Sequence, residues 1–180
     1  IRAMKTETFE LDVGFAGALG AGNETIEARQ GMRKLGTMVE LGPRLKWELG
    51  AGPAGGRLSA EFPARAVLDL SDKAAHRGWS LEPKLTYSNR TARGWRYSAS
   101  VSAIVADTRL AQTFYEVRSS EATAARPAYR AEGGLVSWRF GTAFSRSLAR
   151  DWNLFGFARL ETVAGAANES SPLVRRSSGA

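Results

Sequence analysis

The sequence contains no cysteine and a single histidine among its 180 residues. The absence of cysteine excludes disulfide scaffolds, zinc sites built on thiolates and cysteine nucleophiles. No apolar run approaches the roughly 18 residues that a transmembrane helix requires, and no stretch has the character of a signal peptide. The chain begins at Ile1 rather than at Met. We therefore expect it to start inside a longer product, so that a missing signal says nothing against export.

Clustered positive charge is also lacking. Basic residues outnumber acidic residues by 25 to 18, which gives a formal net charge of +7 and a pI near 10.2. Such an excess favours contact with nucleic acid, lipid phosphates or an acidic protein. However, the basic residues never form a run of four, and they alternate with carboxylates. A nucleic-acid footprint gathers on one stretch or face, so we predict no nucleic-acid partner.

The strongest pattern in the chain is a strict alternation of apolar and polar residues. In the stretch GRLSAEFPARAVLDLSD every second residue from Leu58 to Leu70 is apolar, and charges such as Arg57, Glu61 and Arg65 stand between them. Successive side chains of a strand point to opposite faces, so this segment is predicted to be a strand with one apolar and one charged face. In a soluble sheet the apolar face meets a protein core, whereas in an outer-membrane barrel it meets lipid.

Alternation of this kind recurs along the whole chain and predicts an all-β protein. Eight segments of about 10–14 residues begin near Phe9, Leu35, Arg57, Trp79, Trp95, Val136, Trp152 and Leu173, the last being cut short at Ala180. The segment from Trp152 to Val163 alternates less strictly, because its apolar residues Leu154, Phe155 and Phe157 occupy both even and odd positions. Ordinary globular strands average about five or six residues. The pattern is therefore typical of a long-stranded, antiparallel up-and-down meander.

The connections favour a membrane barrel over a soluble one. Short and longer connections alternate along the chain, in the order 20–34, 50–56, 71–78, 89–93, 106–128, 146–150 and 164–172. Bacterial outer-membrane barrels have short periplasmic turns and longer external loops. Trp79, Trp95 and Trp152 each begin a predicted strand, as expected for aromatic girdles at the two bilayer interfaces. We predict a transmembrane β-barrel of the outer-membrane type; a soluble, lipocalin-like binding barrel is the alternative.

In a membrane barrel the polar residues of the alternating pattern, which we call the polar parity, would face the lumen. The candidate lumen residues are Arg44, Lys46, Glu48, Arg57, Glu61, Arg65, Asp69, Glu82, Lys84, Arg96 and Arg139. With Glu10, Asp12 and Glu40 they make seven basic against seven acidic side chains, which predicts a paired and occluded interior because buried charges must be paired. The long 106–128 connection is a further candidate, since long ordered loops tend to be functional. Its Asp107, Arg109, Phe114 and Tyr115 would either plug the barrel mouth or cap its rim.

Signals for catalysis and for cofactors are sparse. The single histidine, His76, would need a nucleophile and an orienting carboxylate to act as a base, and Ser71, Asp72 and Ser80 are its sequence neighbours. An outer-membrane lipid hydrolase is thus the last alternative. The glycine-rich stretch at 50–56 lacks the Lys-Ser/Thr of a phosphate-binding loop and is predicted to be a turn. We predict no enzyme activity, no metal and no cofactor.

Several short motifs go beyond pattern. They are ARQGMRKLG at 28–36, GPRLKW at 42–47, RGWSLEPKLTY at 77–87, FYEV at 114–117, RPAYRAEGGL at 126–135, DWNLFGFARLE at 151–161 and AANESSPLVRR at 166–176. Together, in this order, they resemble the MltA-interacting protein (MipA) / outer-membrane protein V (OmpV) family. The resemblance covers nearly the whole chain. It implies a Gram-negative outer-membrane barrel without catalytic residues.

The resemblance also implies a function and a missing part. It implies a scaffold that links a lytic transglycosylase and a murein synthase to the outer membrane; the alternative is a narrow channel or small-molecule-binding barrel. Such proteins have further strands before the position of Ile1 and a complete last strand. We therefore expect residues 1–180 to form one barrel domain that lacks N-terminal strands and the end of its last strand. About eight strands would be visible of 10–12. The oligomeric state is not predicted.

Overall fold

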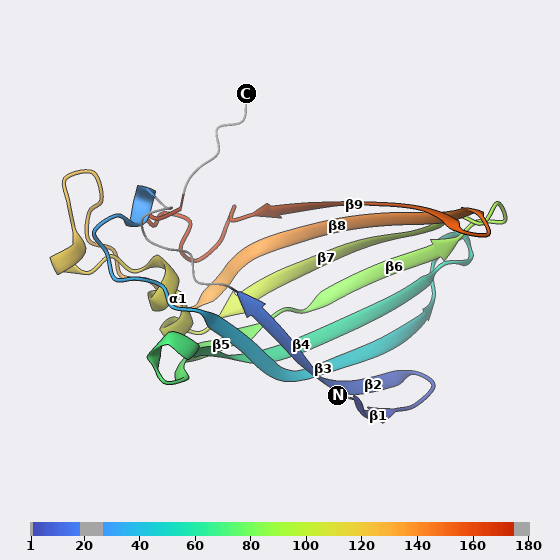
Figure 1. Ribbon diagram of the computed structural model, residues 1–180, viewed down its shortest axis with the longest axis horizontal. Helices are drawn as coiled ribbons and strands as arrows, with labels where there is room; N and C mark the ends of the chain where they lie inside the picture. Colours follow the sequence, from blue (N-terminus) through green and yellow to red (C-terminus); the bar gives the residue numbers. More distant parts are fainter. Residues whose placement is uncertain (1, 19–26, 175–180) are drawn as a thin grey trace.

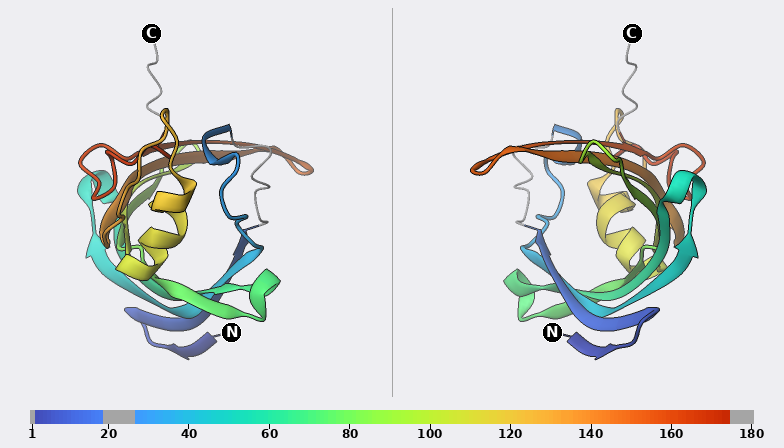
Figure 2. Two further views of the ribbon diagram at one scale, coloured as in Figure 1. Left: turned by 90° about the vertical axis from the view of Figure 1, so that its left-hand side faces the viewer. Right: turned by 90° about the vertical axis from the view of Figure 1, so that its right-hand side faces the viewer.

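Nine antiparallel strands form one strongly curved sheet in the computed structural model (Figures 1 and 2), which describes residues 2–18 and 27–174. The strands run in the spatial order β1-β2-β3-β4-β5-β7-β8-β9. β6 follows β5 along the same line toward the other end of the sheet, and it too lies between β4 and β7. The predicted all-β, antiparallel, barrel-like fold is thereby confirmed. The strands are β1 (Arg2–Lys5), β2 (Phe9–Ala18), β3 (Met38–Ala51), β4 (Arg57–Asp69), β5 (Ala75–Leu81), β6 (Lys84–Arg90), β7 (Arg96–Ala106), β8 (Gly134–Ala149) and β9 (Trp152–Thr162).

In residues 2–18 and 27–174, helical structure occurs at one end of the sheet and in one turn at the other end. The α-helix α1 spans Thr108–Tyr115, and the 3₁₀ turns are η1 (Glu27–Arg29), η2 (Pro53–Gly55), η3 (Leu70–Asp72) and η4 (Ser119–Glu121). In the described part of the chain, no helix has the length and apolar character to cross a bilayer.

The structure corrects the predicted strands in three places. The strand predicted from Trp79 is two strands, β5 and β6, because Glu82 and Pro83 interrupt the ladder and Pro83 has no N–H to donate. The short β1 was not predicted. The strand predicted from Leu173 is wrong where it can be compared: Leu173 and Val174 lie in a turn, since Ser171 accepts hydrogen bonds from both of their N–H groups. Residues 175–180 lie outside the described residues.

The two ends of the sheet differ in their connections, as Figure 1 shows. The short connections β3–β4, β6–β7 and β8–β9 lie together at one end, which we name the turn end. The helix α1 and the longer connections lie at the other end, which we name the loop end. Within the described residues β1 pairs only with β2, and β9 only with β8, so the sheet keeps two edges.

The sheet has a concave inner face and a convex outer face, and α1 lies on the concave side (Figure 2). The apolar parity of the strands points outward. Large apolar side chains on it are between 41% and 75% exposed, namely Val13, Phe15, Leu41, Trp47, Leu49, Phe62, Leu85, Phe140, Phe144 and Leu160. The strands therefore turn their apolar side chains away from the chain's own interior, which is the reverse of a soluble binding barrel.

The small apolar core lies at the loop end, under α1. It consists of Met38, Val67, Ala106 and Leu110, with Leu35, Phe114 and Val136 packed against it. The helix begins at Asp107, whose carboxylate accepts a hydrogen bond from the N–H of Leu110 at 2.9 Å. Leu110 and Ala111 are buried on the helix face that meets the sheet. The N-terminal cap thus fixes where α1 starts, and its apolar face holds it on the concave side.

The contact between α1 and β5 requires a glycine. Gly78 has φ +135°, and a Cβ on it would lie 2.7 Å from the backbone nitrogen of Leu110 and against the Asp107 carboxylate. Any side chain at position 78 would push α1 off the sheet. By contrast, Gly55 in the β3–β4 turn has φ +75° and open space around its Cα.

We expect Gly78→Ala to lower the free energy of unfolding by roughly 2 kcal/mol or more, because steric overlap adds to backbone strain. The matched control is Gly55→Ala, which has only the cost of the left-handed backbone, about 1 kcal/mol. Urea-induced unfolding followed by tryptophan fluorescence, together with limited proteolysis of residues 107–133, measures both effects. Equal destabilisation by the two variants, with α1 protected in both, would contradict this packing.

Candidate functional site

The inner face of the sheet carries the charged side chains, and it is the candidate functional site. Alternation along β3, β4, β7 and β8 directs their polar parity to the concave side. Antiparallel pairing then decides which charges meet, because directly opposite residues are within side-chain reach. Asp12 stands opposite Arg44, and Glu161 stands opposite Arg139. The site is thus built from cross-strand charge pairs rather than from one motif.

A continuous series of ion pairs, which we name the inner ladder, runs across this face. Its centre is Glu82, between β5 and β6, which accepts from Arg139 at 2.7 Å and from Ser102 at 3.1 Å and lies 3.5 Å from Arg65. The links are Glu40–Arg65 at 3.3 Å, Arg65–Glu82, Glu82–Arg139, Arg139–Glu161 at 3.2 Å and Glu161–Arg159 at 3.3 Å. The ladder therefore connects β3 to β9 by side chains alone.

A second group of charges lies beside β2. Arg44 donates to Asp12 from Nε at 3.0 Å and also from Nη2, a bidentate arrangement. Lys46 pairs with Glu48 at 3.0 Å. Glu61 lies opposite Lys46 on one side and Lys84 on the other in the strand register. The two ion pairs, with Glu61 facing both lysines, balance the charge of the inner face on the side of the sheet away from β9.

The remaining candidate lumen residues lie near the ends of the strands. At the loop end Asp69 accepts from the N–H of Ser71 at 3.0 Å and from Arg77 at 2.8 Å, so it caps η3. At the turn end Arg57 and Arg96 make no ion pair with any residue in 2–18 or 27–174. Seven of the eleven candidates thus form ion pairs. Among the described residues, Glu61 and Lys84 face each other in the register without an ion pair, and Arg57 and Arg96 at the turn end have neither an ion pair nor an acidic residue directly opposite.

The long connection after β7 folds onto the inner face instead of projecting away. Asp107 caps α1, Phe114 packs against the loop-end core, and Arg109 is exposed on the outer side of the helix. Tyr115 is half-buried, and burial, together with the negative charge of Glu161, raises the pKa of its hydroxyl. A cavity of about 300 Å³ separates α1 from the inner ladder and is lined by Leu110, Phe114 and the ladder residues Glu40, Arg65, Glu82 and Arg139.

Arginines from distant segments fasten this connection, and sequence reasoning missed them. Arg29 donates to the Phe114 carbonyl at 2.9 Å, and Arg33 donates to the Gln112 carbonyl at 2.8 Å. Arg126 donates to the carbonyls of Ala28, Gln30 and Glu121. These acceptors are backbone groups, which leave no trace in residue types. The segment around η1 is thereby bound across the chain to residues 112–126.

Two more polar groups complete this cap. The Asn168 amide exchanges hydrogen bonds with the backbone of Glu132 at 2.7 and 3.0 Å, and the Ser171 hydroxyl donates to the Tyr115 carbonyl at 2.8 Å. Burial opposes ionisation of Glu121, but hydrogen bonds from the backbone N–H groups of Arg33 and Arg118 outweigh it and hold the pKa of its carboxyl below the ordinary value. The loop end is therefore tied by polar contacts as well as by its apolar core.

The structure brings no nucleophile and base together around the histidine. His76 lies on β5 and packs edge-on against Trp79, with ring centroids 5.4 Å apart. Its Nε2 has no hydrogen-bond partner among the described residues. Asp69 and Asp72, the nearby carboxylates, pair instead with Arg77. In residues 2–18 and 27–174 no group of three or more His, Cys, Asp and Glu side chains is arranged to hold a metal.

Comparison with known proteins gives one finding. The family model described as MltA-interacting protein MipA matches residues 1–180. No curated protein and no solved structure matches the chain.

We expect Glu82→Gln to lower the free energy of unfolding by roughly 1–3 kcal/mol, because it leaves two partly buried arginines without their shared carboxylate. The matched control is Glu48→Gln, whose pair with Lys46 is 37–40% exposed and is worth at most about 1 kcal/mol. Urea titration of the refolded protein measures both. Equal effects of the two variants would show that Glu82 does not hold the inner ladder together.

Proposed function

Because the chain belongs to the MltA-interacting protein MipA family, we propose that it is a β-barrel protein of the bacterial outer membrane that acts as a non-enzymatic scaffold. Its partners would be murein-remodelling enzymes: the lytic transglycosylase MltA, after which the family is named, and a murein synthase. The observation that carries this proposal is the match of the family model over the whole chain. The two faces of the sheet support it independently.

The outer face supports a place in lipid. Its large apolar side chains are not buried by the chain itself, and an apolar band on the outside of a barrel is the surface that a bilayer covers. Short turns at one end and long connections at the other match a barrel with a periplasmic and an external side. On this proposal Leu58, Phe62 and Leu68 face lipid, and outer-membrane lipid is a partner of the protein.

The inner face favours a scaffold function rather than that of an open pore. The inner ladder pairs the charges that would otherwise make an ion path, and α1 lies across the concave side at the loop end. Paired charges of this kind favour one register of the strands over an open ion path. The partner-binding surface would then lie on the ends of the barrel, where enzymes of the periplasm can reach the turn end.

Within the turn end, exposed arginines are the natural contacts for an enzyme with acidic surface. Arg93 in the β6–β7 turn and Arg150 in the β8–β9 turn are exposed and form no ion pair in the described part of the chain. Arg130 at the loop end is equally exposed and unpaired within the same residues. These three positions allow the two ends to be compared with matched charge changes.

We expect purified MltA to bind the full chain in nanodiscs, and the double variant Arg93→Glu/Arg150→Glu to weaken binding several-fold, mainly by slowing association. Arg130→Glu should leave affinity unchanged. Surface plasmon resonance at two salt concentrations provides the measurement. Absence of binding by the unaltered chain would contradict the scaffold, whereas equal affinities of both variants would contradict only the turn end as its surface.

A narrow channel is the second candidate function, favoured by the cavities along the inner face. One of about 270 Å³ lies between Lys84 and Arg159, beside the cavity of about 300 Å³ under α1. They are separated by ladder residues such as Arg139, which line both. A conducting path would require these ion pairs to open.

We expect the full-length protein to be silent in a planar lipid bilayer, because the paired inner ladder and α1 close the interior. Single-channel recording tests this, with a known porin as the positive control. Steady openings whose conductance changes in Arg65→Ala would make the protein a channel and would remove the main support for an occluded scaffold.

A further inference from the structure

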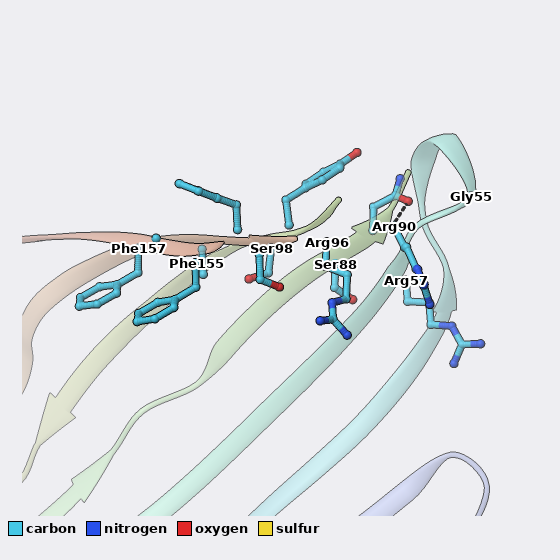
Figure 3. Close-up of a pocket in the computed structure, with 14 residues that line it drawn as sticks. Gly55, Arg57, Ser88, Arg90, Arg96, Ser98, Phe155 and Phe157 are labelled. Carbon is cyan, nitrogen blue, oxygen red and sulfur yellow. Dashed lines mark hydrogen bonds between the residues drawn. The ribbon is translucent and has the colours of Figure 1, made fainter. Parts of the chain in front are cut away.

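The turn end of the inner face contains a hollow unlike the rest of that face. It has a volume of about 580 Å³. Figure 3 shows Arg57, Ser88, Arg96, Ser98, Phe155 and Phe157 on the same side of the strands. No carboxylate lines it, although every part of the inner ladder contains one. The hollow therefore combines unneutralised positive charge with exposed aromatic rings.

Strand register explains how these side chains come together. One cross-strand row on the inner face consists of Arg57, Ser88, Ser98, Ala143 and Phe157, each opposite the next. The neighbouring row consists of Arg90, Arg96, Ser145 and Phe155. In both rows arginine stands at one end, phenylalanine at the other, and small residues between them. The small residues leave the space that forms the hollow.

The positions of the arginines lower the stability of the sheet. Arg90 on β6 lies directly opposite Arg96 on β7, and like charges in directly opposite positions destabilise a sheet. Within residues 2–18 and 27–174, neither these two side chains nor Arg57 forms an ion pair. Elsewhere on the inner face the same strands set Arg44 and Arg139 beside carboxylates. An anion bound between Arg90 and Arg96 would relieve this repulsion.

The phenylalanines are also out of place for a polar inner face. Phe155 and Phe157 are 73% and 78% exposed, and they occupy the β9 positions that share the inner face with Arg159 and Glu161. This is the stretch in which apolar residues fall on both parities. Two adjacent rings on the polar side form an apolar platform, next to arginines that bind anions.

We propose that this hollow binds a small amphipathic carboxylate, with its carboxylate between Arg90 and Arg96 and its alkyl or aromatic body on Phe155 and Phe157. Arg96 and Phe155 lie two strands apart, about 10 Å, which fits a carboxylate with an apolar body of that length. The volume of the hollow is in the range of ligand pockets. This site is independent of the scaffold role proposed above.

Isothermal titration of the full chain in zwitterionic nanodiscs with 2-naphthoate tests the site, with protein-free nanodiscs subtracted. We expect saturable binding at one site per chain, weakened by added salt. The neutral alcohol 2-naphthylmethanol and inorganic phosphate should each bind at least about tenfold more weakly. The alcohol has no negative charge for the arginines, and phosphate has no apolar body for the phenylalanines. If phosphate bound as tightly as naphthoate, the proposal that the ligand is amphipathic would be wrong. If naphthoate showed no saturable binding, the proposed site itself would be wrong.

Variants separate the two halves of the hollow. Arg90→Gln/Arg96→Gln and Phe155→Ser/Phe157→Ser should each weaken naphthoate binding by about tenfold or more. The charge-matched control Arg109→Gln/Arg130→Gln changes two exposed arginines at the loop end, outside both rows, and should bind normally. Loss of like-charge repulsion predicts that Arg96→Gln alone resists urea at least as well as the unaltered chain. Unchanged naphthoate affinity in the Arg90→Gln/Arg96→Gln variant, or an equal loss in the Arg109→Gln/Arg130→Gln control, would contradict the proposal.

Discussion

The structure depends on one constraint: a strand must place its side chains on two opposite faces. Once the apolar parity points outward, every charge of the other parity is brought onto a concave surface, where it needs a partner. Glu82 meets this need for two strands at once, because it accepts from Arg139 and lies beside Arg65. The inner ladder is therefore the direct consequence of an inverted barrel, and the core that a soluble sheet would have is replaced by paired charges.

The same constraint explains why the apolar core is small and lies at the loop end. Where the sheet meets α1, the inner face carries the apolar side chains of Met38, Val67 and Ala106, and Leu110 of the helix is buried against them. The helix is in turn held by hydrogen bonds from Arg29 and Arg33, which lie in the segment that precedes β3. Four of the motifs that resemble the MipA family, at 28–36, 114–117, 126–135 and 166–176, meet in this cap. Short motifs far apart in the chain thus form one structural unit.

Period-two alternation was enough to predict most of the strands, because each has one apolar and one polar face. It could not reveal the break between β5 and β6, since Leu81 and Leu85 keep the same parity across Pro83. The eight-residue α1 is too short for a helical period to stand out. For the site, alternation identifies which charges share a face but not which of them pair. Pairing depends on register, and register brings Glu161 beside Arg139 from a strand that contributed no candidate lumen residue.

The two ends of the inner face show how such a surface can be specialised. At the loop end, carboxylates and carbonyls satisfy the arginines, as Arg77 with Asp69 illustrates, and the result is a stable cap. At the turn end, Arg90 and Arg96 face each other without a carboxylate in their rows. Neutralising them would have required only one acidic residue in place of Ser88, Ser98 or Ser145, all of which already point to the same side. A repulsive pair retained beside exposed phenylalanines on an otherwise neutralised surface is better explained by a bound anion than by the stability of the sheet.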